Sequence, residues 1–132
     1  MAKPQILTKR ILVVDDEPFV CEAVKMMLAF DGHSVMTTNS AKEALIILES
    51  EKFDLVITDF SMPVMKGDEL AVLIKKRFPT QPVVMITAYA EMLGSSGKSL
   101  PGVDYLIGKP FLLENLREVI AKVLPPDTSS KS

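Results

Sequence analysis

The sequence predicts an α/β fold: a single doubly wound (βα)5 domain with helices on both faces of a five-stranded parallel sheet. Three observations lead to this prediction. Short apolar runs that suit strands alternate with amphipathic patterns that suit helices along the chain. The first run, residues 11–14, is apolar at every position, which is typical of a strand covered on both faces. The length of 132 residues suits one hydrophobic core.

The expected strands are short apolar runs that end at polar or turn-forming residues. They span residues 11–14, 34–37, 54–58, 83–87 and 103–107. Right-handed connections place the carboxyl end of every parallel strand at the same edge of the sheet. Ligands of open α/β sheets bind at that edge, so the side chains that follow each strand are the first candidates for a functional site.

The expected helices occupy the segments that follow these strands, at residues 17–31, 40–50, 67–78, 89–99 and 112–124. Gly32 closes the first helix as the residue just past its end. Ser40 and Glu43 have the spacing of a capping box at the start of the second helix. Pro79 stops the third helix, and Pro125 stops the last one.

The composition is that of one ordinary globular domain. We expect this domain at residues 10–124, an N-terminal extension at 1–9, and a disordered tail or the start of a linker at 125–132. A net charge of −2 and a pI of about 5.4 provide no basic field for direct nucleic-acid binding. No apolar stretch is long enough for a signal peptide or a membrane span, so we expect a cytoplasmic protein. The lone Cys21 excludes a multi-cysteine metal site.

Charged and polar residues follow four of the predicted strands. Asp15 and Asp16 come after the first strand, Asp59 after the third, Thr87 ends the fourth, and Lys109 follows the fifth. Three carboxylates on one edge repel one another, and a hard divalent cation relieves that repulsion. Oxygen ligands of this kind suit Mg²⁺, or Mn²⁺ in its place.

A carboxylate beside bound Mg²⁺ stays ionised and can attack phosphorus, which makes Asp59 the candidate phosphoryl acceptor. Lys109 would neutralise the phosphoryl oxygens, and Thr87 could donate a hydrogen bond to one of them. The Met62-Pro63 pair stiffens the loop that follows, so that the backbone carbonyl of Ser61 can turn toward the metal. Gly67 permits a close backbone approach or a positive φ at the start of the next helix.

In order, spacing and strand context, these motifs resemble the response regulator receiver domain of two-component signalling. The residues that carry the resemblance are Asp15-Asp16, Asp59-x-x-Met62-Pro63-x-Met65-x-Gly67, Thr87-Ala88 and Lys109-Pro110-Phe111. The resemblance covers about residues 10–124. It implies the strand order 2-1-3-4-5 and a phosphoryl donor that is a sensor histidine kinase or a histidine phosphotransfer protein.

The resemblance also assigns roles at the site. Asp16 and Asp59 would bind the metal directly, and Asp15 would act through a water molecule. The Lys109–Pro110 bond would be cis. Phosphorylation would pull Thr87 toward the phosphate and remodel the face made by the fourth helix, the fifth strand and the fifth helix, where an unidentified output partner would bind. Homodimer formation stays open, and no membrane association is implied.

Two features depart from the family pattern. The position three residues before Lys109, often an aromatic partner of the threonine in the family, is Leu106, and Tyr105 lies one residue earlier. A shift of one residue in a strand reverses the face, so Tyr105 cannot take over that role.

The Gly- and Ser-rich segment 94–99 predicts a short or mobile fourth helix. Ser61 and Tyr89 occupy positions that tune phosphate lifetime in the family, and their opposite effects leave that lifetime open.

Three other interpretations remain. A degenerate receiver would bind partners without being phosphorylated, and Leu106 keeps that alternative open. A phosphatase of the haloacid-dehalogenase type is disfavoured, because it needs Asp-x-Asp and the sequence here is Asp59-Phe60-Ser61. Asp15 could instead cap the first helix. His33, the only histidine, is expected to be a loop residue without a special role.

Overall fold

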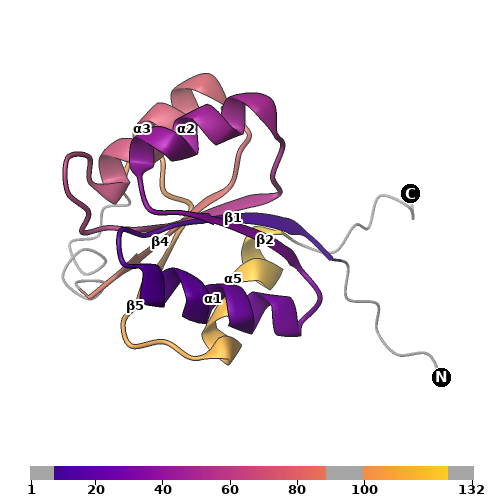
Figure 1. The fold of residues 1–132 in the computed structure, drawn as a ribbon. Helices are drawn as coiled ribbons and strands as arrows, with labels where there is room; N and C mark the ends of the chain where they lie inside the picture. Colours follow the sequence, from indigo (N-terminus) through magenta and orange to yellow (C-terminus); the bar gives the residue numbers. More distant parts are fainter. Residues whose placement is uncertain (1–7, 89–99, 125–132) are drawn as a thin grey trace, which may run out of the picture.

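The computed structural model describes residues 8–88 and 100–124, and its centre is a five-stranded sheet in the order β2-β1-β3-β4-β5 (Figure 1). Neighbouring strands are parallel throughout. The strands are β1 (Arg10–Val14), β2 (Ser34–Thr38), β3 (Leu55–Asp59), β4 (Val83–Thr87) and β5 (Tyr105–Gly108). The predicted fold class and strand order are therefore confirmed.

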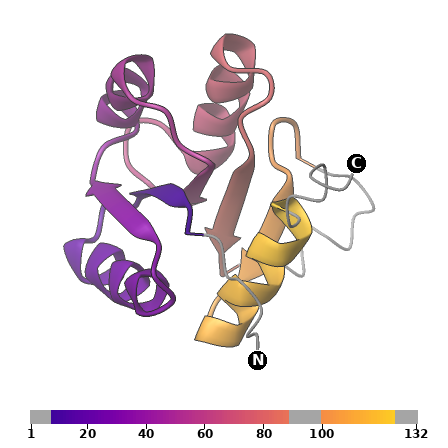
Figure 2. The ribbon, with the colours of Figure 1, turned by 90° about the vertical axis from the view of Figure 1, so that its right-hand side faces the viewer.

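The helices lie in two layers, one on each side of the sheet (Figures 1 and 2). They are α1 (Pro18–Phe30), α2 (Ala41–Ser50), α3 (Gly67–Arg77) and α5 (Leu113–Val123). α1 and α5 cover one face, and α2 and α3 cover the other. The helix predicted over residues 89–99, together with Tyr89, lies outside the described residues. None of the helices in the described ranges is long and apolar enough to span a membrane.

Two hydrophobic cores result from the alternation of side chains along β1 and β3. Ile11 and Ile57 point into the layer of α1 and α5, where they meet Val24 and Leu116. Their neighbours in the strands point into the layer of α2 and α3; this second group includes Leu12, Val14, Val56, Leu70 and Ile74. Because both faces are covered, the strands are apolar on both sides, as parallel sheets require.

The end of β3 and the start of β5 differ slightly from the bounds predicted from the sequence. Asp59 is the last residue of β3 and not the residue after it, and the ladder continues beyond it because the Phe60 N–H donates to the Ile86 carbonyl at 2.9 Å. β5 begins at Tyr105, two residues later than predicted. A turn delays it: Gly102 has a φ of 81°, and the Val103 N–H donates to the Leu100 carbonyl at 3.1 Å.

The predicted caps are confirmed in part. Gly32 has a φ of 91° just past α1, in the left-handed region that favours glycine. The Ser40 hydroxyl accepts the Glu43 N–H at 3.2 Å, as expected at the start of α2. In a full capping box the Glu43 carboxylate would accept the Ser40 N–H in return. Here the Glu43 carboxylate accepts instead from the Thr38 hydroxyl at 2.7 Å. The end of β2 is thereby tied to α2.

His33 makes a structural contact that the sequence did not indicate. Its side chain is buried, and Nδ1 accepts the backbone N–H of Lys9 at 3.0 Å. Burial lowers the pKa of His33, although nearby Asp31 opposes that shift. His33 therefore ties the residue before β1 to the residue before β2 as a neutral imidazole. Its neighbours in sequence could not indicate this partner, which lies 24 residues away.

Candidate metal centre at the carboxyl edge of the sheet

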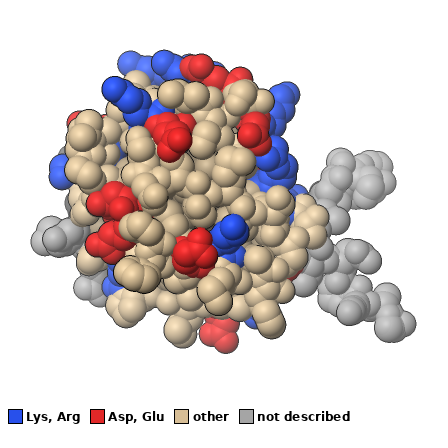
Figure 3. All heavy atoms as spheres, in the orientation of Figure 1, with Lys and Arg blue, Asp and Glu red and all other residues tan. Residues whose placement is uncertain are grey.

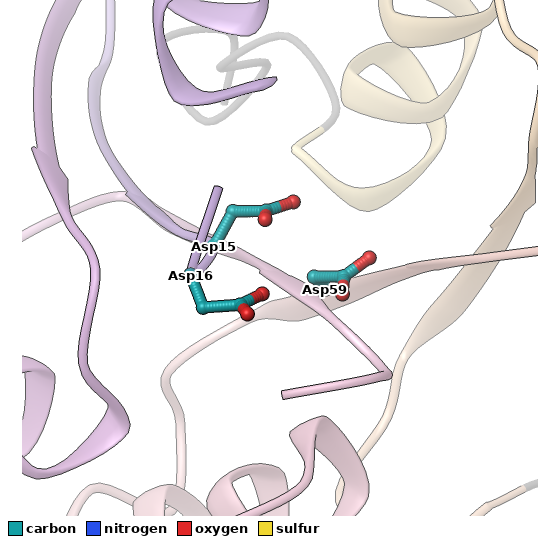
Figure 4. Close-up of side chains that lie close together, drawn as sticks. All are labelled: Asp15, Asp16 and Asp59. Atoms are coloured by element: carbon teal, nitrogen blue, oxygen red, sulfur yellow. The ribbon is translucent and has the colours of Figure 1, made fainter. Parts of the chain in front are cut away.

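Three carboxylates meet at the carboxyl edge of the sheet. Asp15 and Asp16 follow β1, Asp59 ends β3, and one carboxylate oxygen from each lies within 4.8 Å of the others (Figure 4). Asp15 is 3% exposed and Asp59 is 5% exposed, whereas Asp16 is half-buried. The structure thus brings together the three acids that the sequence singled out.

Lys109 reaches this cluster from the loop after β5. Its Nζ lies 2.8 Å from Oδ1 of Asp59, and its backbone N–H donates to the Thr87 carbonyl at 3.0 Å. The Lys109–Pro110 peptide bond is cis, as the family resemblance implied. Partial burial acts to lower the pKa of Lys109, but the hydrogen bond and charge of Asp59 outweigh it and raise the pKa. The ammonium therefore stays charged beside Asp59.

The surroundings of Asp15 disfavour the charged form of its carboxyl group. Burial is the largest cause that raises the pKa of Asp15 to about 6, and the charges of Asp59 and Asp16 add to it. The Glu17 N–H, which donates to Asp15 Oδ1 at 2.9 Å, and the charge of Lys109 act in the opposite direction. A divalent cation would remove the repulsion among the acids.

The donor set fits Mg²⁺. All the side-chain ligands are carboxylate oxygens, which hard cations prefer, and the half-buried position of Asp16 leaves room for the water molecules that Mg²⁺ usually keeps. Neutral nitrogen and thiolate ligands, which softer metals prefer, are absent from the cluster.

The alternative that Asp15 caps α1 is partly right. Glu17 is the N-cap residue of α1, but no side-chain cap bond comes from it. The Asp15 carboxylate instead accepts the Glu17 N–H and so fixes the turn between β1 and α1. The Asp15 carboxylate thus holds this turn through Oδ1, and it also contributes an oxygen to the acid cluster.

The loop after Asp59 is held in a tight conformation. The Met65 N–H donates to the Pro63 carbonyl at 2.7 Å, which closes a γ-turn around Val64 with a φ of 69°. Gly67 lies so close to β3 that an added Cβ would meet the Asp59 carbonyl oxygen at 2.1 Å. Of the two reasons predicted for Gly67, the close approach is thus the one that applies.

The position of Leu106 agrees with the predicted face. Leu106 pairs with Met85 and Gly108 pairs with Thr87, so Leu106 lies on the same face of the sheet as Thr87. Tyr105 lies on the opposite face, where it packs with the core of α1 and α5, and the centroid of its ring lies 5.5 Å from Lys122 Nζ. Thr87 itself is buried, with 2% exposure.

Sequence reasoning missed Asn39, the residue just after β2. Its side-chain amide donates to the Asp15 carbonyl at 2.8 Å. Cys21 was regarded only as packing, yet its thiol also contacts the Asp15 carbonyl at 3.4 Å. Burial raises the pKa of Cys21 to about 11, so it acts as a neutral thiol. The signal for Asn39 was its place at the end of the second strand, on the edge where the acids lie.

Comparisons with known proteins agree on one family. The family model described as the response regulator receiver domain matches residues 11–121. The response regulator protein FleR of Pseudomonas aeruginosa is 36% identical over 117 residues, which cover 88% of this chain and 24% of FleR. The chain spans between about a quarter and about half of the length of the curated relatives it matches.

Solved structures give the same result. The response regulator TrrA of Thermotoga maritima, in complex with Mg(2+)-BeF, has a TM-score of 0.77 and 36% identity, covering 89% of this chain and 100% of that chain. A CheY-like receiver domain protein from Methanospirillum hungatei has a TM-score of 0.81 and 32% identity, covering 96% of this chain and 100% of that chain.

Proposed function

The chain belongs to the response regulator receiver family of two-component signalling, and from this premise we propose that Asp59 is the residue that accepts the phosphoryl group. The observation that carries the proposal is the position of the Asp59 carboxylate. It is buried at a strand end between two further acids and the ammonium of Lys109, whose Nζ is 2.8 Å away. A carboxylate with a metal site on one side and a fixed cation on the other is suited to attack phosphorus.

The other groups would bind charge and hold positions. Asp16, Asp59 and the backbone carbonyl of Ser61 would hold Mg²⁺ directly, and Asp15 would hold it through water. When bound, Mg²⁺ supplies positive charge for the phosphoryl oxygens. Lys109 would move from the Asp59 carboxylate to the phosphoryl oxygens as the bond forms, and the Thr87 hydroxyl would donate to one of them.

Phosphorylation of Asp59 would replace the bond between phosphorus and the donor by a bond between phosphorus and the Asp59 carboxylate. An Asp59 carboxylate oxygen forms a bond to phosphorus while the phosphorus–nitrogen bond of a donor phosphohistidine breaks, and the imidazole leaves with the electron pair. Water later attacks the same phosphorus and regenerates Asp59 with release of inorganic phosphate. The protein would thus catalyse its own phosphorylation and dephosphorylation without being a turnover enzyme. Ser61 would influence how long the phosphate lasts, as would Tyr89, which lies outside the described residues.

The phosphoryl donor would be a sensor histidine kinase or a histidine phosphotransfer protein, and α1 offers a surface for it. Phe19, Met26 and Phe30 are 90%, 69% and 76% exposed, and their spacing places them on one face of the helix. Exposed apolar surface of this kind marks an interaction site. Phe19 lies three residues after Asp16, and exposed Leu112 lies three residues after Lys109, so apolar contacts flank the acid cluster.

The surface around α1 is also poor in charge. In the view of Figure 3, Lys, Arg, Asp and Glu are scattered in small groups, and other residues cover much of the face. A partner would therefore gain more from apolar burial here than from electrostatic attraction. A helical surface carrying the phosphohistidine fits this requirement.

An output partner would bind the surface that includes β5 and α5. A groove of about 240 Å³ lies there, and its lining includes Leu106, Gly108, Pro110 and Glu118. The helix predicted at residues 89–99 would belong to this face but lies outside the described residues.

Intact-protein mass after incubation with acetyl phosphate and Mg²⁺ tests the proposed function. We expect a gain of about 80 Da, one phosphoryl group, that is lost in Asp59→Asn and after metal removal. Asp68→Asn, which removes an acid from the first turn of α3, should still be phosphorylated. No phosphoryl gain in the wild type, together with no binding of beryllofluoride, a stable phosphate analogue, in a calorimetric titration with Mg²⁺, would favour the degenerate receiver that acts only by binding partners.

A further inference from the structure

The backbone carbonyl of Asp15 is held by two side chains from other elements. The Asn39 amide donates to this oxygen at 2.8 Å, and the Cys21 thiol of α1 contacts it at 3.4 Å. On the other side of the residue, the Asp15 N–H donates to the Thr38 carbonyl at 3.1 Å. The Asp15 N–H is thus tied to the last residue of β2, and the Asp15 carbonyl is tied to the residue after β2 and to the buried face of α1.

This carbonyl belongs to the peptide unit that joins Asp15 to Asp16. A peptide unit is planar, so fixing its carbonyl direction fixes the direction in which the chain continues into Asp16. The Asp15 carboxylate is separately held by the Glu17 N–H at 2.9 Å. The Asp16 carboxylate is half-buried, and the backbone that carries it sets the point from which its side chain extends.

We propose that Asn39 is a positioning residue for the metal site, which holds the Asp15–Asp16 peptide so that both carboxylates face Asp59. This inference rests on the proposed function, because it assigns Asn39 to the same metal centre. The three acids repel one another, and without a restraint on the peptide the more exposed one, Asp16, would turn toward solvent. Groups that orient metal ligands in this way commonly change metal affinity by about tenfold or more.

An asparagine suits this place for a chemical reason. Its amide nitrogen is a neutral donor, so it can bind a carbonyl oxygen without adding charge beside the acids. Cys21 lies 3.5 Å from the same amide nitrogen, and together the two side chains occupy the acceptor positions of the Asp15 carbonyl. Cys21 is buried whereas Asn39 is exposed, so Asn39 can be changed without disturbing the core.

The test is the affinity for Mg²⁺, measured by titration calorimetry on the whole chain. We expect Asn39→Ala to weaken Mg²⁺ binding about tenfold. Asn39→Gln, which keeps the amide on a longer side chain, should recover part of the loss. The matched control is Ser40→Ala, which removes the neighbouring hydroxyl that accepts the Glu43 N–H and leaves the Asp15 carbonyl bonds intact.

A second readout separates positioning from general destabilisation. The rate of phosphorylation by acetyl phosphate should require more Mg²⁺ in Asn39→Ala but reach the wild-type plateau once Mg²⁺ saturates. Unchanged Mg²⁺ affinity in Asn39→Ala, or an equal loss in Ser40→Ala, would overturn the assignment of Asn39. If the wild type itself neither binds Mg²⁺ nor gains a phosphoryl group, the proposed function fails. If the wild type and Asn39→Ala bind Mg²⁺ equally well, only the role of Asn39 fails.

Discussion

Lys109 Nζ and Asp59 Oδ1 lie 2.8 Å apart, although α3, β4 and β5 separate the two residues along the described chain. The pair joins the end of β3 to the loop after β5, across the end of β4. Asp59 is 5% exposed and the Lys109 side chain is 35% exposed, so the ammonium approaches the acid from the solvent side. A phosphoryl group that arrives from solvent would meet the ammonium first.

The contribution of this ammonium can be measured in Lys109→Gln. Removing a fixed positive group from the phosphoryl oxygens should slow phosphorylation by acetyl phosphate about 100-fold, because such groups stabilise developing charge. Mg²⁺ binding should remain, since Lys109 is not among the acids of the cluster. Lys122→Gln, a change at an exposed lysine of α5, serves as the control. An undiminished rate in Lys109→Gln would contradict the assigned role.

Asp15 should destabilise the metal-free protein near neutral pH. Its pKa is raised to about 6, mainly by burial, so the folded state binds a proton more tightly than the unfolded state. The stability that this group contributes is full at low pH and is lost as pH rises toward and past 6. Asp15→Asn should therefore raise the metal-free free energy of unfolding at pH 7 by about 2 kcal/mol.

Urea denaturation of the wild type and Asp15→Asn at several pH values, without metal, checks this prediction. The difference between the two proteins should be small near pH 4 and reach its full size by pH 7. Saturating Mg²⁺ should shrink or reverse it at pH 7, because the cation stabilises the ionised acids. A constant difference across the pH range would contradict the raised pKa.

Asp31 and Arg117 form an ion pair that links the end of α1 to α5. Two nitrogens of Arg117 each lie 2.8 Å from an oxygen of Asp31. The hydrogen bond from Arg117 is the largest cause that lowers the pKa of Asp31. A carboxyl with a lowered pKa contributes stability above its unfolded pKa and loses it as pH falls. Arg117→Gln should therefore lower the melting temperature at pH 7 and have less effect near pH 3.

Val64 should be a site where substitution stabilises the fold. Its φ of 69° is unfavourable for a β-branched residue, and its side chain is fully exposed, so it buries no apolar surface. Val64→Gly should raise the free energy of unfolding by about 0.5–1 kcal/mol after the entropic cost of glycine is subtracted. Chemical denaturation measures the change. A destabilised variant would contradict the strain inferred from the positive φ of Val64.

The acids and the lysine could be predicted from the sequence because each lies directly after a strand of a parallel sheet. Their meeting follows from the direction of the strands and needs no detailed packing. His33 precedes its strand and could not be assigned in this way, and the position of Asn39 after β2 indicates the edge on which it lies but not its partner. The Asp15 carbonyl lies 24 residues before Asn39, and the Lys9 N–H lies 24 residues before His33, so both partners depend on how distant segments pack.

Gly102 illustrates the same limit. Its φ of 81° favours glycine, and an added Cβ would lie 2.8 Å from the backbone of Ala71 in α3. Nothing in the local sequence indicates that close approach, because it is a contact between a loop and a helix far apart in the chain. The predicted start of the last strand was early for the same reason: the turn around Gly102 is fixed by α3.

The order of the site residues along the chain has a consequence for synthesis. Asp15, Asp16 and Asp59 all precede β4, whereas Lys109 comes fifty residues after Asp59. A chain emerging from the ribosome therefore exposes every acid of the cluster before its ammonium is made. Such a chain has the acids but not the ammonium, so the positive charge that lies beside Asp59 in the folded protein is made only after β5.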